Sequence, residues 1–122
     1  MTPTARKMTM MITGKLTLNE YQLLAARTDA PMDKLNALRN ATMGMVGEGA
    51  ETLEHMKKVL DQGHELDVDK LIEEGGDTLW YVAKLARVCG ITLEEMAQRN
   101  IDKLKRRYPE GFDPNLSIHR EE

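Results

Sequence analysis

The chain lacks features that several classes of protein require. It has a single cysteine, Cys89, which cannot form an internal disulfide and is consistent with a reducing compartment. No apolar run approaches the roughly 20 residues of a membrane span, and the Met-rich start is too short and interrupted for a signal-peptide core. We therefore expect a soluble, cytoplasmic protein without a membrane partner.

An excess of positive charge is also missing. The formal net charge is −3 and the pI is near 5.7, so the chain has no general attraction for a polyanion such as DNA. The basic run at residues 103–107 has no interleaved aromatic residues, which weakens a nucleic-acid interpretation. No P-loop or dinucleotide-binding glycine pattern occurs. The histidines, expected on the surface because they have no zinc-ligand spacing, are His55, His64 and His119.

Large aromatic residues are few, with one Trp, one Phe and three Tyr. The apolar residues are mostly Leu, Ala, Val and nine Met, a mixture that favours helices with a soft aliphatic core. A chain of 122 residues is long enough for one domain. Because small domains bury a smaller fraction of their surface, we expect a homo-oligomer to cover part of the apolar residues.

Capping signals divide the chain into helices. Thr17-Leu-Asn-Glu20 and Thr92-Leu-Glu-Glu95 have the form of capping boxes, and Gly63 and Gly90 are placed as stop signals. The expected helices cover residues 17–27, 32–62, 68–88 and 92–108. With no strand-like alternation, the fold class is all-α, a four- to five-helix bundle. A flexible leader at 1–16 precedes the domain at 17–113, and a polar, loose tail at 114–122 follows it.

Apolar residues at helical spacing predict which faces are buried. The expected core stripe of the second helix is Leu38, Thr42, Met45, Leu53, Met56 and Leu60. That of the third helix is Leu71, Ile72, Leu79, Val82, Ala83 and Ala86. Three glycines between residues 44 and 49 also predict a bend or break in the second helix.

Two pairs of carboxylates carry the clearest chemical signal. Glu48 and Glu51 stand three apart on the second helix, and Glu74 and Asp77 stand three apart on the third. Carboxylates so close repel unless a cation or proton lies between them, and Mg²⁺ prefers such oxygen ligands. Either pair alone is also consistent with a solvated acidic face, because the chain has 20 acidic residues.

Helix position favours a lined cavity over a solvated face for three of these acids. Glu74 and Asp77 share a side with Tyr81, and Glu48 lies beside small residues that would let another helix approach. Periodicity does not place Glu51 inward.

The fourth helix carries polar groups on an apolar face. Asn100, Lys103 and Arg107 share that face with Leu93 and Leu104. Buried cations need partners, which either the carboxylates or a polyphosphate would supply. Structural salt bridges are one interpretation. The other is metal-assisted attack on a phosphoanhydride, with the two cations stabilising the developing charge.

These residues form a pattern that resembles the MazG-like nucleoside triphosphate pyrophosphohydrolases. The shared motifs, in the family's order and spacing, are Glu48-Gly-Ala-Glu51, Glu74-Gly-Gly-Asp77, Trp80-Tyr81, Asn100-x-x-Lys103 and Arg107-Tyr-Pro-Glu-Gly-Phe112. The resemblance covers about residues 35–113. It departs from the family at Gly75, where a larger apolar residue is usual, and in the Gly47/Gly49 pair.

The resemblance implies an all-α dimer or tetramer that hydrolyses a nucleoside triphosphate to the monophosphate and pyrophosphate. It assigns Mg²⁺, with Mn²⁺ as a substitute, to Glu48, Glu51, Glu74 and Asp77. It further assigns substrate binding to Asn100, Lys103, Tyr81 and Arg107. Trp80 is more often a packing residue than a base-stacking platform in such a position. Open alternatives are a phosphoribosyl-ATP pyrophosphohydrolase and a non-catalytic nucleotide-binding oligomer.

Overall fold

A computed structural model describes residues 14–120 of the chain. Its elements are α2 (Leu18–Ala25), the 3₁₀ helix η1 (Ala26–Thr28), α3 (Lys34–Gln62), α4 (Val68–Val88), α5 (Leu93–Arg107) and α6 (Pro114–Ile118). No strand occurs within the described residues, which confirms the all-α prediction. Most of the predicted leader, residues 1–13, lies outside the described part.

Local capping explains where the helices begin and end. Thr17 and Glu20 exchange both bonds of a capping box at the start of α2, and the Thr92 hydroxyl accepts a bond from the Glu95 amide at the start of α5. The Asp33 side chain caps α3, so this helix begins at Lys34. Gly63 ends α3 with a φ of 72°, a left-handed conformation that suits glycine. The predicted boundaries are confirmed within a few residues.

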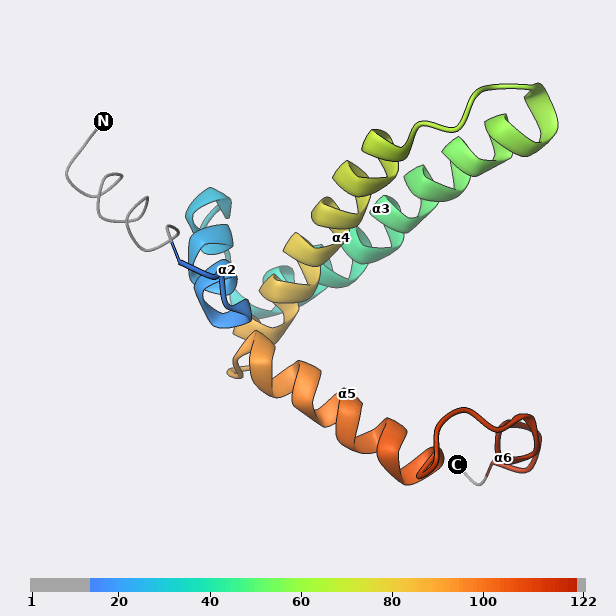
Figure 1. Ribbon diagram of the computed structural model, residues 1–122. Helices are drawn as coiled ribbons and strands as arrows, with labels where there is room; N and C mark the ends of the chain where they lie inside the picture. Colours follow the sequence, from blue (N-terminus) through green and yellow to red (C-terminus); the bar gives the residue numbers. More distant parts are fainter. Residues whose placement is uncertain (1–13, 121–122) are drawn as a thin grey trace.

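The helices α3 and α4 form a long antiparallel hairpin (Figure 1). The helix stays continuous through Gly44, Gly47 and Gly49, so the predicted break is wrong. Short α2 packs on α4 near the end where α5 begins, and α5 then leaves the hairpin at a wide angle. The described chain is therefore a hairpin with an arm rather than a closed four-helix bundle.

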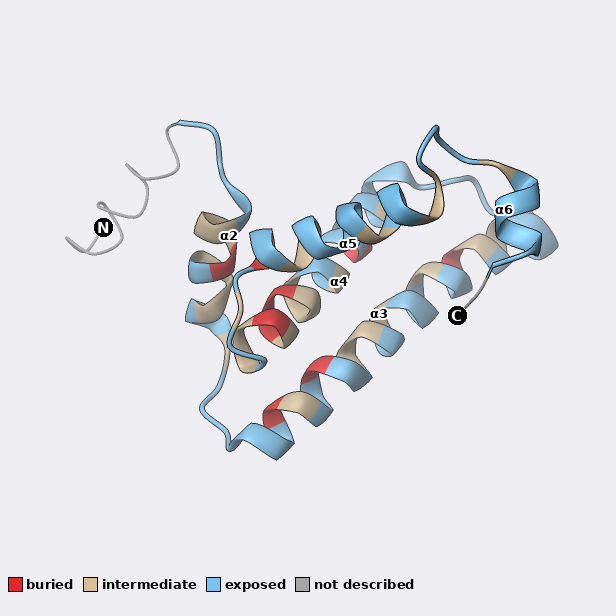
Figure 2. Ribbon diagram, turned by 90° about the horizontal axis from the view of Figure 1, so that it is seen from below, coloured by how far each residue is buried: buried red, intermediate tan, exposed pale blue. Residues whose placement is uncertain are grey.

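The apolar core is small. Among the described residues, the buried apolar side chains are Ala37, Ala41, Ala83, Ala86 and Leu93. Figure 2 shows buried segments mainly where α2 meets α4 and along the side of α3 that faces α4. One short chain with so few buried apolar groups hides little surface from water.

Part of the predicted core stripe of α3 is not buried within a single chain, so that part of the prediction is wrong for one chain. Leu53 and Leu60 are 70% and 75% exposed, because α3 turns Ala41, Glu48 and His55 toward α4 instead. His55, expected on the surface, is buried, and its ring nitrogen accepts a bond of 3.1 Å from the Asp67 amide. This bond ties the end of α3 to the start of α4.

Exposed apolar residues gather on one side of the hairpin, which we call the hairpin face. Val46, Leu53 and Leu60 lie about 120–160° around α3 from its α4-facing line, at 100° per residue. Three α4 residues lie at about the same angle around that helix, and they are Val68, Ile72 and Leu79. Because the helices run antiparallel, equal rotations lead to the same side of the hairpin.

The tail beyond residue 113 is not wholly irregular. It contains α6, which begins with Pro114 and is capped by the Asp113 side chain. Tyr108 and Phe112 contact each other before it, with ring centroids 5.4 Å apart. No helix within residues 14–120 has the length and apolarity needed to span a membrane.

Candidate functional site

Three carboxylates converge where α3 faces α4. Glu48, Glu74 and Asp77 each offer an oxygen, and these oxygens lie within 4.8 Å of one another. Glu74 is buried, Glu48 is half-buried and Asp77 is exposed. One oxygen of Glu48 and one of Glu74 are buried and have no hydrogen-bond partner in the described part of the chain. Such oxygens need a cation or a proton between them.

Glu51 joins this group electrostatically. Its pKa is raised, first by hydrogen bonding with Glu74 and then by the negative charge of Glu74. The pKa of Glu74 is raised as well, mainly because the carboxyl is buried and next because of its contact with Glu48. Two carboxylates within hydrogen-bonding reach share a proton when no cation is present. We call Glu48, Glu51, Glu74 and Asp77 the acid cluster.

A glycine lets α3 and α4 approach closely beside the acid cluster. A Cβ added to Gly44 would lie 2.2 Å from Cε1 of Tyr81, so only glycine leaves room for this ring. Tyr81 lies one turn beyond Asp77 on α4 and thus on the same face. The close approach brings Glu48 of α3 within ligand distance of the α4 acids.

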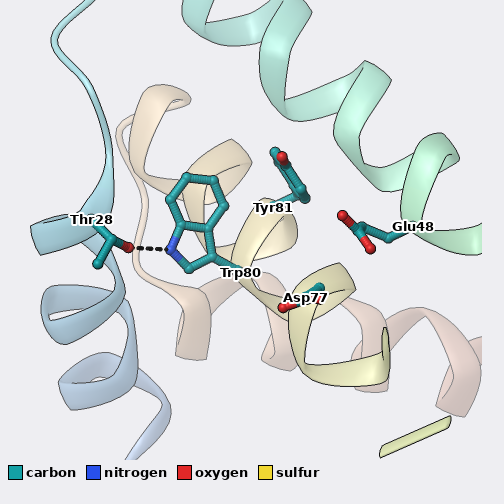
Figure 3. Close-up of a pocket in the computed structure, with 5 residues that line it drawn as sticks. All are labelled: Thr28, Glu48, Asp77, Trp80 and Tyr81. Carbon is teal, nitrogen blue, oxygen red and sulfur yellow. Dashed lines mark hydrogen bonds between the residues drawn. The ribbon is translucent and has the colours of Figure 1, made fainter. Parts of the chain in front are cut away.

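A pocket of about 370 Å³ opens beside the acids, lined by Thr28, Glu48, Asp77, Trp80 and Tyr81. Figure 3 shows Glu48 reaching from α3 toward Asp77 and Tyr81 on α4. Trp80 and Tyr81 meet edge to face, with centroids 4.9 Å apart. The pocket therefore joins an anionic end to an aromatic end.

Trp80 is held from behind by the chain around η1. Its indole N–H donates to the Ala25 carbonyl at 3.0 Å and to the Thr28 hydroxyl at 2.9 Å. These bonds agree with the packing interpretation of this residue, although its ring also lines the pocket. An anchored indole presents a fixed surface to whatever enters.

Sequence reasoning missed two neighbours of the acids. Thr28 lines the pocket from η1. Tyr21 on α2 has a raised pKa, first because it is partly buried and second because of the nearby charge of Asp77. Neither residue stands in a recognisable motif, since both come from α2 and η1, whose packing on α4 is a tertiary feature.

The polar residues of α5 are not brought to the acids within one chain. Asn100 is exposed, and Lys103 and Arg107 are half-buried on the arm that leaves the hairpin. Within residues 14–120, no hydrogen bond or ion pair joins α5 to the acid cluster. The polar residues Asn100, Lys103 and Arg107 on the expected inward face of this helix therefore have no polar side-chain partner within residues 14–120.

The donor set of the acid cluster fits a hard divalent cation. Glu48, Glu74 and Asp77 place carboxylate oxygens within reach of one ion, and two of these side chains each have an oxygen with no hydrogen-bond partner among the described residues. Mg²⁺ and Mn²⁺ both suit carboxylate ligands, whereas zinc prefers His and Cys. The arrangement can bind a metal that also contacts phosphate oxygens of a ligand in the adjoining pocket.

The chain resembles known proteins over most of its length. The sequence profile of the MazG nucleotide pyrophosphohydrolase domain matches residues 35–112. The "Gene 37 protein" of Mycobacterium phage L5 is 35% identical over 100 residues, which cover 75% of this chain and 88% of the relative. No solved structure matches the chain significantly. The matched segment includes the acid cluster and most of the pocket, and the chain belongs to the MazG nucleotide pyrophosphohydrolase family.

Proposed function

We propose that this protein is a Mg²⁺-dependent pyrophosphohydrolase that converts a nucleoside or deoxynucleoside triphosphate to the monophosphate and pyrophosphate. The observation that carries the proposal is the acid cluster, which has two oxygens without a hydrogen-bond partner among the described residues, beside a pocket of about 370 Å³ lined by two aromatic rings. The proposed role is clearance of surplus or aberrant nucleotides in the cytoplasm.

In this proposal Glu48, Glu51, Glu74 and Asp77 hold Mg²⁺, for which Mn²⁺ can substitute. When bound, the metal neutralises phosphate oxygens and makes a water more acidic. Water adds to the α-phosphorus while the bond to the α,β-bridging oxygen breaks, so that pyrophosphate leaves. The aromatic end of the pocket, with Trp80 and Tyr81, shields one side of the ligand from solvent.

We further propose that the active protein is a homodimer or homotetramer. The hairpin face exposes apolar residues such as Val46 (74%) and Ile72 (67%), which a second copy would cover. The acid cluster has no cationic partner among the described residues, whereas Lys103 and Arg107 have no ion pair there. A second copy that brings its α5 near the acids would add Asn100, Lys103 and Arg107 as contacts to the substrate phosphates.

The test is pyrophosphate release from a panel of ribo- and deoxynucleoside triphosphates with Mg²⁺. We expect release by the wild type and loss of release in Glu51→Gln and Asp77→Asn, both checked for folding by circular dichroism. Glu54→Gln and Glu73→Gln are matched controls, because these exposed acids neighbour the cluster in sequence without belonging to it. They should retain wild-type rates.

The same panel separates the alternatives. Release from phosphoribosyl-ATP alone would identify phosphoribosyl-ATP as the substrate in place of a nucleoside triphosphate. The proposed metal site would be unaffected by that result. A rise in melting temperature with Mg²⁺ and nucleotide, without any product, would identify a non-catalytic binding protein. No release and no stabilisation by any nucleotide would overturn the proposal.

A further inference from the structure

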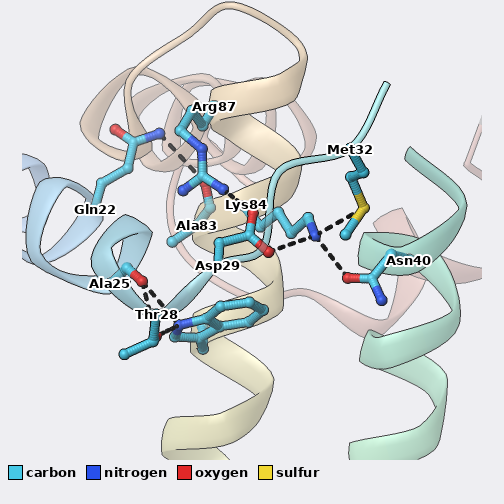
Figure 4. A network of polar contacts seen from close by, with 10 residues as sticks. Gln22, Ala25, Thr28, Asp29, Met32, Asn40, Ala83, Lys84 and Arg87 are labelled. Atoms are coloured by element: carbon cyan, nitrogen blue, oxygen red, sulfur yellow. Dashed lines mark hydrogen bonds and ion pairs between the residues drawn. The ribbon is translucent and has the colours of Figure 1, made fainter. Parts of the chain in front are cut away.

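Lys84 is the largest side chain that is fully buried among the described residues, with 1% of its surface exposed. Its ammonium donates to Asp29 at 2.8 Å and to Asn40 at 2.7 Å, and it contacts the sulfur of Met32 at 3.5 Å (Figure 4). Arg87 also pairs with Asp29. Lysine is almost never fully buried unless it is paired, so the burial of Lys84 depends on these polar partners.

The network joins three parts of the chain that are distant in sequence. Asp29 and Met32 belong to the link between η1 and α3, Asn40 belongs to α3, and Lys84 and Arg87 belong to α4. Buried ion pairs of this kind are often no more stabilising than apolar residues of similar volume. Their better-supported role is to select one arrangement of the elements they join.

The network also contacts one wall of the pocket. The Lys84 ammonium lies 5.7 Å from the centroid of the Trp80 ring, within the range of a cation–π interaction. Trp80 in turn donates to the Ala25 carbonyl and to the Thr28 hydroxyl. Thr28 immediately precedes Asp29 in the chain. Thr28 and Trp80 both line the pocket. The indole is thus held by η1 through its N–H and by Lys84 at its face.

We propose that Lys84 is a positioning residue that fixes Thr28 and Trp80 as a rigid wall of the pocket and thereby sets the affinity for nucleotide. The effect on nucleotide affinity rests on the proposed function. The role of Lys84 in holding Thr28 and Trp80 in place does not rest on the proposed function, and it can be measured separately. The acid cluster lies further along the same hairpin, and among the described residues none of its four acids bonds to a member of this network, so metal binding is expected to be independent of Lys84.

The test is Lys84→Met, which keeps the length of the side chain and removes its charge. Trp80 is the single tryptophan of the chain, so its fluorescence reports on the wall alone. We expect a red-shifted emission and stronger quenching by acrylamide. We also expect a KM for nucleotide about tenfold higher, with kcat within about twofold of the wild type, because substrate positioning is loosened. The rise in melting temperature caused by Mg²⁺ alone should be unchanged.

Two further variants keep the test decisive. If the single variant fails to fold, Lys84→Met combined with Asp29→Asn also removes the carboxylate charge that Lys84 balances, and it should show the same fluorescence and KM changes. Arg99→Gln breaks an exposed ion pair with Glu95 on α5, far from the pocket, and should change neither readout. Wild-type emission, quenching and KM in both Lys84 variants would overturn the proposal, even if their melting temperatures fall. If the wild type hydrolyses no nucleotide, the proposed function fails, while emission and quenching still decide whether Lys84 holds the wall.

Discussion

Glu48 and Glu74 face each other from neighbouring helices, and each has one buried carboxylate oxygen to which no residue from 14 to 120 donates a hydrogen bond. Two such groups repel unless a proton or a cation lies between them. Without a cation, this repulsion therefore opposes the packing of α3 on α4 at the acid cluster. A bound cation should stabilise the fold as well as the site.

Glu74→Gln tests this link between site and stability. Removing one negative charge relieves the repulsion with Glu48, so we expect the melting temperature in EDTA to rise by a few degrees. The same change removes a ligand, so the stabilisation by Mg²⁺ should largely disappear. Glu73→Gln, at the exposed neighbouring position, is the control and should keep the wild-type response to Mg²⁺. Differential scanning fluorimetry over a Mg²⁺ series measures both effects.

The pH dependence of stability should have a distinctive sign. The pKa values of Glu51 and Glu74 are raised above the ordinary 4.5, so the folded protein holds these protons more tightly than the unfolded chain. Without metal, stability should therefore fall as the pH rises from about 4.5 through the raised values. Asp33, whose pKa is lowered mainly by hydrogen bonds from Asn36, acts in the opposite direction, but its contribution is complete above its ordinary value of 3.8.

Melting temperatures measured from pH 5 to pH 8, with EDTA or with Mg²⁺, check this expectation. The stabilisation by Mg²⁺ should be larger at pH 8, because fewer protons compete with the metal. A double variant with Glu51→Gln and Glu74→Gln should lose most of the pH dependence seen in EDTA. An equal response to Mg²⁺ at both ends of the range would show that the acid cluster does not bind the metal.

Gly44 and Gly47 provide a matched pair of helix glycines. Gly44→Ala would place a methyl group against the Tyr81 ring, so we expect a loss of about 1–3 kcal/mol in the free energy of unfolding and a weaker response to Mg²⁺. At Gly47 nothing lies within 4 Å, and alanine should stabilise the helix by about 0.5–1 kcal/mol. Urea unfolding measures the free energy of unfolding of both variants. Changes of the same sign in the two variants would contradict the close packing of Tyr81 on α3.

Gln22 should be the main anchor of α2. Its buried side chain donates to the carbonyls of Ala83 and Ile91 and accepts from the Leu93 amide. Gln22→Ala would leave these buried groups without partners, at a cost of about 1–3 kcal/mol in urea unfolding. Asn19→Ala is the control and should cost much less, since within residues 14–120 the Asn19 side chain bonds only to the exposed Glu94.

The hairpin face can be tested by its effect on assembly. Leu53 is 70% exposed in a single chain, and Leu53→Lys would place a charge in the proposed contact between copies. We expect light scattering after size exclusion to show a shift toward monomer. Leu23→Lys, at a leucine of α2 with 67% exposure, should leave the assembly unchanged. A monomeric wild type with full pyrophosphate release would contradict the proposed oligomer.

Helix boundaries could be read from the sequence because they depend on neighbouring residues. Thr17 with Glu20, Gly63 and Gly90 act within one or two turns of their own positions, so capping rules apply directly. Residues 68–88 were expected to be helical, and α4 covers them. The break predicted at the glycines of α3 does not occur, because their intrinsic cost is outweighed by the pairing of this helix with α4.

Burial and site composition were less predictable because they depend on which helices meet. Periodicity indicated that Glu74 and Asp77 share a face, and the structure joins them with Glu48. Periodicity did not indicate that Leu53 is exposed. An apolar stripe has the same sequence pattern whether it packs against the same chain or against another copy. The buried Lys84 gave no signal at all, because its partner Asp29 lies 55 residues away.

The wall that Thr28 forms with Trp80 has one more consequence. The matched MazG segment begins at residue 35, after Thr28 and Asp29, and it contains every member of the acid cluster. The proposed metal ligands and part of the residues that shape the pocket are thus encoded in separate stretches of the gene. Under the proposed function, substitutions at 18–33 would change which nucleotide enters while every proposed metal ligand stays the same, so substrate choice would be open to redesign without rebuilding the chemistry.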